Sequence, residues 1–187
     1  ATELAKQLSG KSAHASVGVG AYEHAVNASG SPKDIETILQ LMYLNFTAPR
    51  FDETDLQNLK NMYVPYFRNM EADPGYLMGK AFQETLYQNH VRRQATSAAQ
   101  IESLNLETLA SVHKQLFSYA DDFRFVIAGN VDLNTLKPLV EKYIGSLPTS
   151  KKVEYAVVDD GVRTATGKVT NDFRVAMQQP KVSVYLT

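Results

Sequence analysis

The stretch Phe123-Arg124-Phe125-Val126-Ile127-Ala128-Gly129-Asn130-Val131-Asp132 decides the fold of this chain. Its first six residues are mostly apolar and predict a buried strand, which breaks at Gly129-Asn130. A helix is then predicted from about Asp132 to a stop at Gly145, because apolar residues recur at helical spacing at positions 136, 139, 140, 143 and 144. The segment therefore reads as a strand followed directly by a helix.

The residues before this stretch predict one long strand and several helices. Residues 1–8 are typical of the end of an amphipathic helix, and residues 14–26 alternate as a half-buried strand does, followed by a turn at 27–30. Four helix starts follow: Ser31-Pro32 with Asp34 as a capping-box acid, Asp52, Asp73-Pro74 and Asn105. Pro49 should end the first of these helices, Pro65 should kink or shorten the second, and residues 88–97 form a polar loop. The order of elements predicts an α+β fold, with helices packed on one face of a small, mostly antiparallel sheet.

Composition excludes several classes of function. The chain has 187 residues, with 19 Lys and Arg against 20 Asp and Glu, so its net charge is −1. Nucleic-acid binding and polybasic membrane binding both favour a basic surplus. The absence of cysteine excludes disulfides, a thiolate zinc site and a cysteine nucleophile. No apolar run approaches the roughly 18–20 residues that a membrane span needs.

The sequence becomes more polar after Pro148. We predict an α+β domain over residues 1–149 that is partial at its N-terminus, a linker or wrapping segment over 150–179, and the first strand of a next domain over 180–187. The helix-like start and the alternating strand pattern of Val182 to Leu186 lead us to expect a segment of a longer protein.

The four histidines do not form a metal-binding pattern. On one continuous strand, His14 and His24 would lie roughly 33 Å apart, too far to share an ion. The segment Gly20-Ala21-Tyr22-Glu23-His24 fits the zinc pattern H-x-x-E-H except that glycine replaces the first histidine, and it is strand-like where that pattern needs a helix. His113 is expected to be a surface or half-buried helix residue. We therefore predict no metal ligand in this segment.

Other candidates for chemistry have simpler structural interpretations. Ser29-Gly30-Ser31 reads as cap chemistry, Gly18-Val19-Gly20 as a bulge or close backbone approach, and Asp121-Asp122 as solvated turn residues. His90 with Arg92-Arg93 would suit a carboxylate or a peptide terminus, although a solvated loop is the simpler interpretation. We assign no catalytic residue, and the substrate-binding residues stay unknown.

A more specific signal comes from the order of several motifs. Residues 118–132, containing Val126-Ile127-Ala128-Gly129-Asn130-Val131-Asp132, are followed by Tyr143-Ile144-Gly145-Ser146-Leu147-Pro148. Upstream lie Leu8-Ser9-Gly10-Lys11 and the block from Ser31-Pro32-Lys33-Asp34 to Pro49-Arg50-Phe51-Asp52. Together these motifs resemble the insulinase/pitrilysin family of zinc metallopeptidases, in particular its bacterial members with two fused halves. The resemblance covers about residues 8–185.

The resemblance implies both a fold and a role. Domains of this family share the α+β fold of the LuxS and mitochondrial-processing-peptidase type, and two homologous halves enclose a substrate chamber. The chain is similar to the non-catalytic C-terminal half. The resemblance therefore implies that zinc lies in the N-terminal half of the same polypeptide and that this segment holds no cofactor. It also implies a peptide or unfolded polypeptide as the substrate. An Arg/Tyr pair that steadies the substrate in this family is not assigned to Arg174 and Tyr185. Exported bacterial relatives favour the periplasm.

Two other interpretations stay open at this point. The parent protein would be a scaffold member of the same superfamily without peptidase activity if its zinc motif were lost. Alternatively, the segment would be a stand-alone peptide-binding module that uses an exposed sheet edge, such as residues 182–186. The resemblance favours a parent that is a zinc metallopeptidase, and this segment alone is expected not to be an enzyme.

Overall fold

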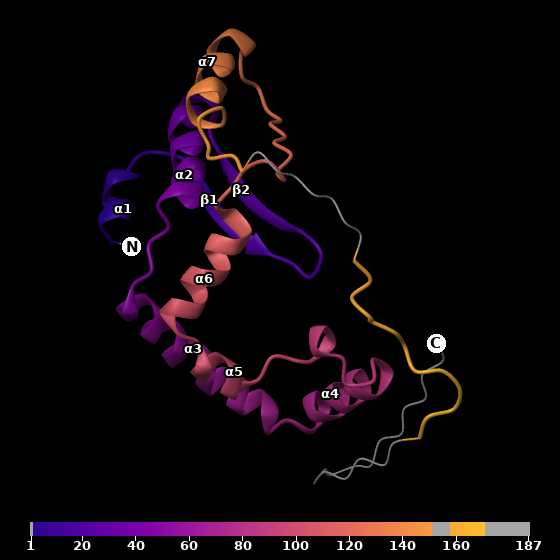
Figure 1. Cartoon of the computed structure of the whole chain (residues 1–187). Coiled ribbons are helices and arrows are strands. Elements are labelled where there is room, and N and C mark those ends of the chain that lie inside the picture. The colour runs from indigo at the N-terminus through magenta and orange to yellow at the C-terminus, as the bar shows by residue number, and fades with distance from the viewer. Residues whose placement is uncertain (1, 151–157, 171–187) are drawn as a thin grey trace. The chain divides into compact units, whose positions relative to one another are not determined.

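A computed structural model describes residues 2–150 and 158–170 of the chain (Figure 1). These residues fall into two compact units, each of which is treated by itself. Unit 1 comprises the described residues 2–51 and 106–150, and unit 2 comprises 52–105 and 158–170. The helices of the described ranges include none that is both long enough and apolar enough to cross a membrane.

Unit 1 begins with α1 (Thr2–Gln7) and an antiparallel hairpin of β1 (Ala13–Val19) and β2 (His24–Gly30). The prediction of one strand over residues 14–26 with a turn at 27–30 is therefore wrong. The chain reverses at residues 20–23, where the Gly20 N–H donates to the Glu23 carbonyl at 2.9 Å. A Cβ on residue 20 would lie 2.8 Å from that carbonyl oxygen, so glycine permits the tight turn.

The helix α2 (Ile35–Thr47) covers one face of the hairpin and packs against both strands. A 3-10 turn, η1 (Pro32–Asp34), precedes it. Ser31 makes no side-chain cap there, contrary to the prediction, and Asp34 does not form a capping box. The Asp34 carboxylate instead accepts a hydrogen bond from the Ser12 backbone N–H at 2.9 Å. This contact ties the start of the helix to the chain just before β1, so a non-local partner replaces the expected local one.

Unit 1 is completed by α6 (Leu106–Phe117), an extended segment and α7 (Leu133–Tyr143). The helix α7 begins where predicted, with the Asp132 side chain accepting from the Thr135 N–H at 3.0 Å. The predicted buried strand over residues 123–128 is wrong in the described structure, since this segment joins no ladder. Phe123 and Phe125 are half-buried whereas Arg124 and Val126 are exposed, so the alternation of a strand is present without a paired neighbour.

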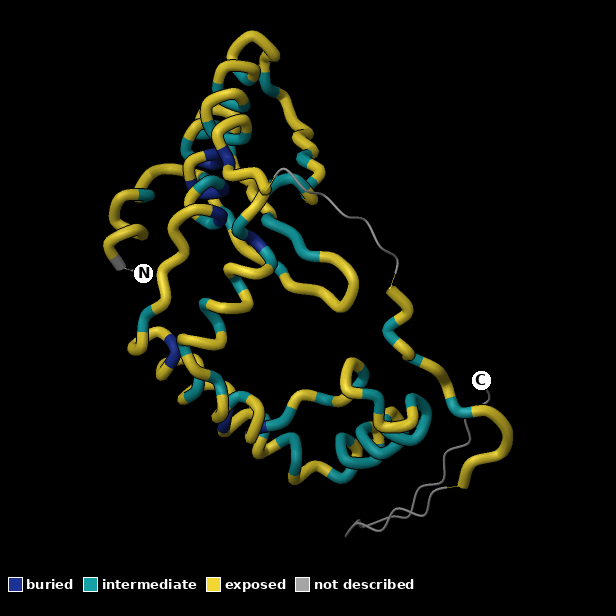
Figure 2. The backbone as a smooth tube through the Cα atoms, viewed as in Figure 1, coloured by how far each residue is buried: buried dark blue, intermediate teal, exposed yellow. Residues whose placement is uncertain are grey.

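The core of unit 1 lies between α2, α6 and the turn after α7 (Figure 2). Its buried members are Leu39, Met42, Phe46, Phe117 and Leu147. Phe46 lies at the centre of an aromatic group, with ring centroids 4.9 Å from Phe123, 6.1 Å from Phe125 and 6.3 Å from Phe117. Edge-to-face packing of this kind adds to the stabilisation from apolar burial. Unit 1 is therefore an α+β layer with helix α2 on a small antiparallel sheet, and the predicted fold class is confirmed.

Unit 2 is helical in its described residues. It contains α3 (Glu53–Glu71), α4 (Pro74–Leu86), η2 (Val91–Arg93) and α5 (Ala98–Ser103). The predicted caps are present: Asp52 accepts from the Thr54 N–H at 2.9 Å, and Asp73 accepts from the Tyr76 N–H at 2.8 Å. The helix α3 continues through Pro65 to Glu71. The linker predicted over residues 150–179 and the strand predicted at 180–187 lie wholly or partly outside the described residues.

Candidate functional site

Unit 1 contains a groove of about 780 Å³. One wall is residues 22–32, which include all of β2, and the other wall is residues 122–129 of the extended segment between α6 and α7. The apolar face of α2 forms the floor, with Ile38, Leu39, Met42 and Phe46. We call this feature the β2 groove.

The chemistry of the β2 groove suits binding rather than bond cleavage. Its charged lining residues are Glu23, Asp122 and Arg124, and its floor is apolar. His24 lies at the start of β2, where its ring centroid is 6.2 Å from that of Phe117 and its buried Nδ1 atom makes no hydrogen bond within the described residues. A nucleophile paired with a base is not found among the residues that line this groove.

The histidines do not converge on a common point. In the hairpin register His14 lies opposite Ser29, whereas His24 lies opposite Val19. Five residues of strand, or roughly 17 Å, therefore separate them. His113 Nε2 lies 2.9 Å from the Asn45 carbonyl oxygen, and its ring packs 5.1 Å from that of Phe117. Within residues 2–150 and 158–170, three or more His, Asp or Glu side chains do not come together as a metal site.

The cluster of His90, Arg92 and Arg93 lies in unit 2 and contacts other parts of that unit. His90 Nδ1 accepts from the Arg92 N–H at 3.3 Å, and its Nε2 then donates to the Asp160 carbonyl oxygen at 2.9 Å. The Arg92 guanidinium lies 3.9 Å from the Asp160 carboxylate, and the Arg93 guanidinium lies 5.1 Å from the centre of the Tyr87 ring. These contacts hold residues 158–165 against the end of α4, so a structural role accounts for the cluster.

The remaining candidates are also structural where the structure describes them. The Asp121 carboxylate accepts from the Ser150 N–H and so joins the two ends of the α7 region. Gly18 lies within β1 with ordinary space around it, and Gly20 makes the close backbone approach at the hairpin turn. Because Gly20 and His24 flank this turn, they do not share the helix that an H-x-x-E-H zinc site requires.

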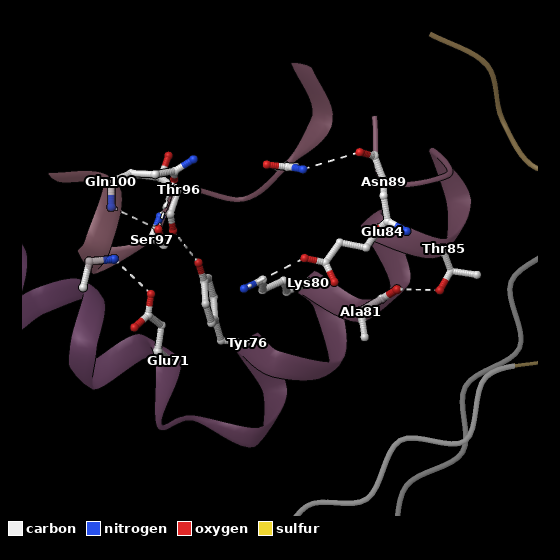
Figure 3. A network of polar contacts seen from close by, with 12 residues as sticks. Glu71, Tyr76, Lys80, Ala81, Glu84, Thr85, Asn89, Thr96, Ser97 and Gln100 are labelled. Carbon is white, nitrogen blue, oxygen red and sulfur yellow. Dashed lines mark hydrogen bonds and ion pairs between the residues drawn. The ribbon is translucent and has the colours of Figure 1, made fainter. Parts of the chain in front are cut away.

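A polar network joins α3, α4 and α5 in unit 2 (Figure 3). Tyr76 Oη donates to the Thr96 carbonyl at 2.8 Å, and the Ala98 N–H donates to the Glu71 carboxylate at 2.9 Å. Ser97 and Gln100 form a reciprocal capping box that starts α5. The sequence pattern Ser-x-x-Gln at residues 97–100 is the signature of such a capping box. This signal was overlooked, since residues 88–97 were assigned to a loop and no helix was predicted at residues 98–103. The network fixes helices and holds no reactive pair.

In unit 1, a second polar group joins α2 to α7. Glu36 Oε1 accepts from Lys142 Nζ at 3.0 Å and from Tyr143 Oη at 2.8 Å, and Gln40 Nε2 donates to Tyr143 Oη at 2.9 Å. The hydrogen bond from Lys142, followed by that from Tyr143, lowers the pKa of Glu36 below its ordinary 4.5. These side chains are exposed, so their contacts hold α7 against α2 and do not form a buried reactive site.

This arrangement gives a testable pH dependence. Because the folded pKa of Glu36 is depressed, its contribution to stability is present above the ordinary value of 4.5 and is lost as pH falls through the folded pKa. We expect Lys142→Met to raise the Glu36 titration midpoint towards 4.5 in a carboxyl-carbon NMR titration. Lys137→Met is the matched control, because Lys137 lies 4.0 Å from Glu141 on the same helix. An unchanged Glu36 midpoint in Lys142→Met would contradict the assigned cause.

The β2 groove is the feature that sequence reasoning missed. The alternation of Phe123 and Phe125 with Arg124 and Val126 indicated an extended segment, but it carried no information on what lies beside it. The hairpin turn was hidden because apolar residues keep the same parity on both sides of it, at positions 15, 17, 19, 21 and 25, with Glu23 as the one polar exception.

The chain is similar to a known protein family and to several known proteins. Residues 103–187 match the profile of the family described as "Peptidase M16 inactive domain". The chain is 23% identical over 159 residues to a probable zinc protease PqqL of Haemophilus influenzae, covering 83% of this chain and 16% of the relative. It is 25% identical over 125 residues to PqqL of Escherichia coli, covering 67% and 13%. A zinc protease PQQL-like protein of Arabidopsis thaliana is 26% identical over 161 residues, covering 82% and 17%.

Solved structures carry the same fold. The periplasmic protease PqqL of Escherichia coli matches with a TM-score of 0.67 and 23% identity, over 80% of this chain and 16% of that protein. A mutant of the ferredoxin protease FusC, in complex with Arabidopsis ferredoxin, matches with a TM-score of 0.64 and 14% identity, also over 80% and 16%. The chain thus spans about one sixth of the length of these relatives or less. The resemblance inferred from the sequence is confirmed: residues 103–187 match the inactive domain of the peptidase M16 family, and the relatives similar to most of the chain are PqqL-type zinc proteases.

Proposed function

We propose that this chain forms part of the substrate chamber of a larger zinc metalloendopeptidase, whose zinc site lies in the other half of the same polypeptide. The observation that carries the proposal is the match of residues 103–187 to the inactive domain of the M16 family. The relatives that resemble the chain over most of its length are zinc proteases by name. The parent would act on peptides or unfolded polypeptides and would hold them between its two halves.

The contribution of this chain would be confinement and positioning. Its described histidines do not fit a zinc site: His90 and His113 bond to backbone carbonyls, and His14 and His24 lie at different ends of the hairpin. Zinc in the other half would supply a polarised water as the nucleophile. A rigid wall opposite that site limits the motion of the substrate and excludes bulk water, and accurate positioning of this kind can account for a large part of a catalytic barrier.

The first test separates this segment from its parent. We expect the purified 187-residue chain to cleave no quenched-fluorescence peptide and to hold far less than one zinc per chain by elemental analysis. The parent protein should cleave the same peptide, and a chelator should abolish that cleavage. Chelator-sensitive cleavage by the 187-residue chain, or one tightly held zinc in it, would contradict the proposal. A parent without cleavage would instead favour the scaffold interpretation.

The second test asks whether this region faces the substrate. A peptide substrate carrying a photoreactive benzophenone is bound to the chelated parent and irradiated, and the cross-linked fragments are identified by mass spectrometry. We expect cross-links within residues 1–187 that an excess of unlabelled peptide suppresses. Competable cross-links confined to the catalytic half would remove this region from the chamber wall.

Two further assignments belong to this proposal. We place the domain boundary in the segment 150–179, with residues 180–187 opening the next domain, and limited proteolysis of the parent would test this placement. The compartment is proposed to be the periplasm, which is supported by the periplasmic description of the solved PqqL protease of Escherichia coli. Cell fractionation tests that assignment.

A further inference from the structure

Residues 158–165, which we call the strap, lie against the end of α4 in unit 2. Two contacts with main-chain oxygens hold the strap there: the Ala165 N–H donates to the Leu86 carbonyl at 2.7 Å, and His90 Nε2 lies 2.9 Å from the Asp160 carbonyl. Five of the eight strap residues are exposed, and the other three are only half-buried. A segment with so little buried surface can leave its site without unfolding the rest of the unit.

The turn that receives the strap has a strained backbone. Gln88 and Asn89 have φ values of +54° and +58°, in the left-handed region that residues other than glycine seldom enter. Asparagine tolerates this region better than most residues, whereas glutamine has no such preference. The strap contacts this turn directly, since Gln88 Nε2 donates to the Thr164 carbonyl oxygen at 3.4 Å. Strain of this kind persists where the surroundings hold it in place, and the strap is part of those surroundings.

His90 joins the turn to the strap through both of its ring nitrogens. Nδ1 accepts from the Arg92 N–H at 3.3 Å, so the proton of the neutral ring lies on Nε2 and is donated to the Asp160 carbonyl. A protonated ring carries a hydrogen on each nitrogen. Its Nδ1–H would face the Arg92 N–H, donor against donor, and the ring would have to turn, which also moves Nε2 away from the strap. The geometry therefore fits the neutral imidazole and not the imidazolium.

The charges around His90 partly offset one another. The Arg92 guanidinium lies 3.9 Å from the Asp160 carboxylate of the strap, so one cation and one anion are paired close to the ring. Other charged groups of η2, the strap and α4 are engaged with partners of their own: Arg93 with the Tyr87 ring, Asp159 with Arg163, and Lys80 with Glu84. Hydrogen-bond geometry, more than net charge, therefore decides which form of His90 the docked strap accepts.

We propose that His90 makes the strap a pH-sensitive latch, which is docked on the turn at residues 87–90 while His90 is neutral and is released when His90 is protonated. Histidine ordinarily changes its charge between about pH 5 and pH 8, so docking should be present above this range and lost as pH falls through it. Release would also let Gln88 and Asn89 leave the left-handed region, which favours the released state. The strap lies within the domain boundary proposed above at 150–179, so release would lengthen the free connection between the two domains.

Hydrogen exchange of the parent at about pH 7.5 and about pH 5.5 tests the proposal. The readout is the protection of the Ala165 amide, corrected for the intrinsic effect of pH on exchange, and we expect it to fall about fivefold or more at the lower pH. His90→Gln should abolish this response, because its side-chain amide can donate to the Asp160 carbonyl but does not titrate. His113→Gln is the matched control and should leave the response intact, since His113 Nε2 also lies 2.9 Å from a backbone carbonyl, that of Asn45 in unit 1.

Three outcomes would overturn the proposal. The first is equal protection of the Ala165 amide at both pH values, and the second is a fall that persists in His90→Gln, since another group would then cause it. The third is a fall shared by the amides of residues 78–84 in α4, which would be unfolding of the unit instead of release of the strap. If His90→Gln itself leaves these α4 amides unprotected, the wild-type comparison of Ala165 with α4 decides. The proposal does not depend on the chamber role, because the cross-linking experiment reports on bound peptide alone.

Discussion

Replacing Phe117 by alanine should lower the free energy of unfolding by about 3–5 kcal/mol, the largest effect expected from a single substitution in unit 1. Phe117 is 1% exposed and ends α6 within the core. Its ring lies 5.1 Å from that of His113, 5.8 Å from that of Phe123 and 6.3 Å from that of Phe46. Truncation loses this burial and leaves a cavity that the surrounding rings can fill only in part.

Urea unfolding followed by far-ultraviolet circular dichroism measures this change. Tyr119→Ala is the matched control, since Tyr119 is an aromatic residue two positions away and is 54% exposed. Its cost should stay below about 1 kcal/mol. Because Phe117 also supports His24 on β2 and Phe123 on the opposite wall, the substitution should loosen both sides of the β2 groove. A loss below about 1 kcal/mol in Phe117→Ala would show that this core packing is wrong.

Local signals in the sequence predicted most of the helices. Asp52, Asp73 and Asp132 each place a carboxylate where the first turn of a helix leaves N–H groups unpaired, and each forms the expected cap. Such a signal depends on neighbouring residues, so it is legible in the sequence and holds where no distant group competes for the capping side chain. The capping box of Ser97 and Gln100 is another local signal that the sequence contains, although Ser97 was assigned to a loop.

Non-local contacts explain where the predictions failed. Asp34 has the spacing of a capping-box acid, but the Ser12 N–H is available across the hairpin and takes its carboxylate. Residues 123–128 have the pattern of a strand, and their phenylalanines point to the core as predicted. A strand also needs a neighbour at its edge, and no pattern within six residues specifies which segment that is. The β2 groove could not be predicted from the sequence for the same reason.

The family assignment rested on a different kind of information. The individual side chains offered no catalytic constellation, and the described structure uses the suspected ones for packing and for hydrogen bonds within the chain. The order of structural motifs around Gly129-Asn130 and Gly145-Ser146 carried the resemblance, and the profile match over residues 103–187 bears it out. The family resemblance was therefore predictable from the order of structural motifs, whereas single reactive residues gave no signal.

A second large effect is expected at Gly30, the last residue of β2, which lies opposite Ala13. A Cβ on Gly30 would lie 2.0 Å from the Ser12 carbonyl oxygen and 2.9 Å from Ile38 Cδ1. That carbonyl also accepts the Ser31 N–H at 2.8 Å, so relieving the clash would disturb the hydrogen bond that joins the hairpin to η1. Gly30→Ala should therefore cost about 1–3 kcal/mol, as overpacking of a tight site does.

Gly18→Ala supplies the matched control for this second prediction. Gly18 lies in β1 of the same hairpin, and a Cβ there would meet Asn27 Nδ2 at 3.8 Å and the Ala25 carbonyl oxygen at 4.0 Å, which is ordinary contact. Removing glycine from a strand without a clash should leave stability unchanged or raise it by about 0.5–1 kcal/mol. The two alanine variants should thus differ in sign or by more than about 1 kcal/mol in urea unfolding. Equal stabilities would mean that β2 does not end against Ser12 and α2, and the wall of the groove at that end would have to be redrawn.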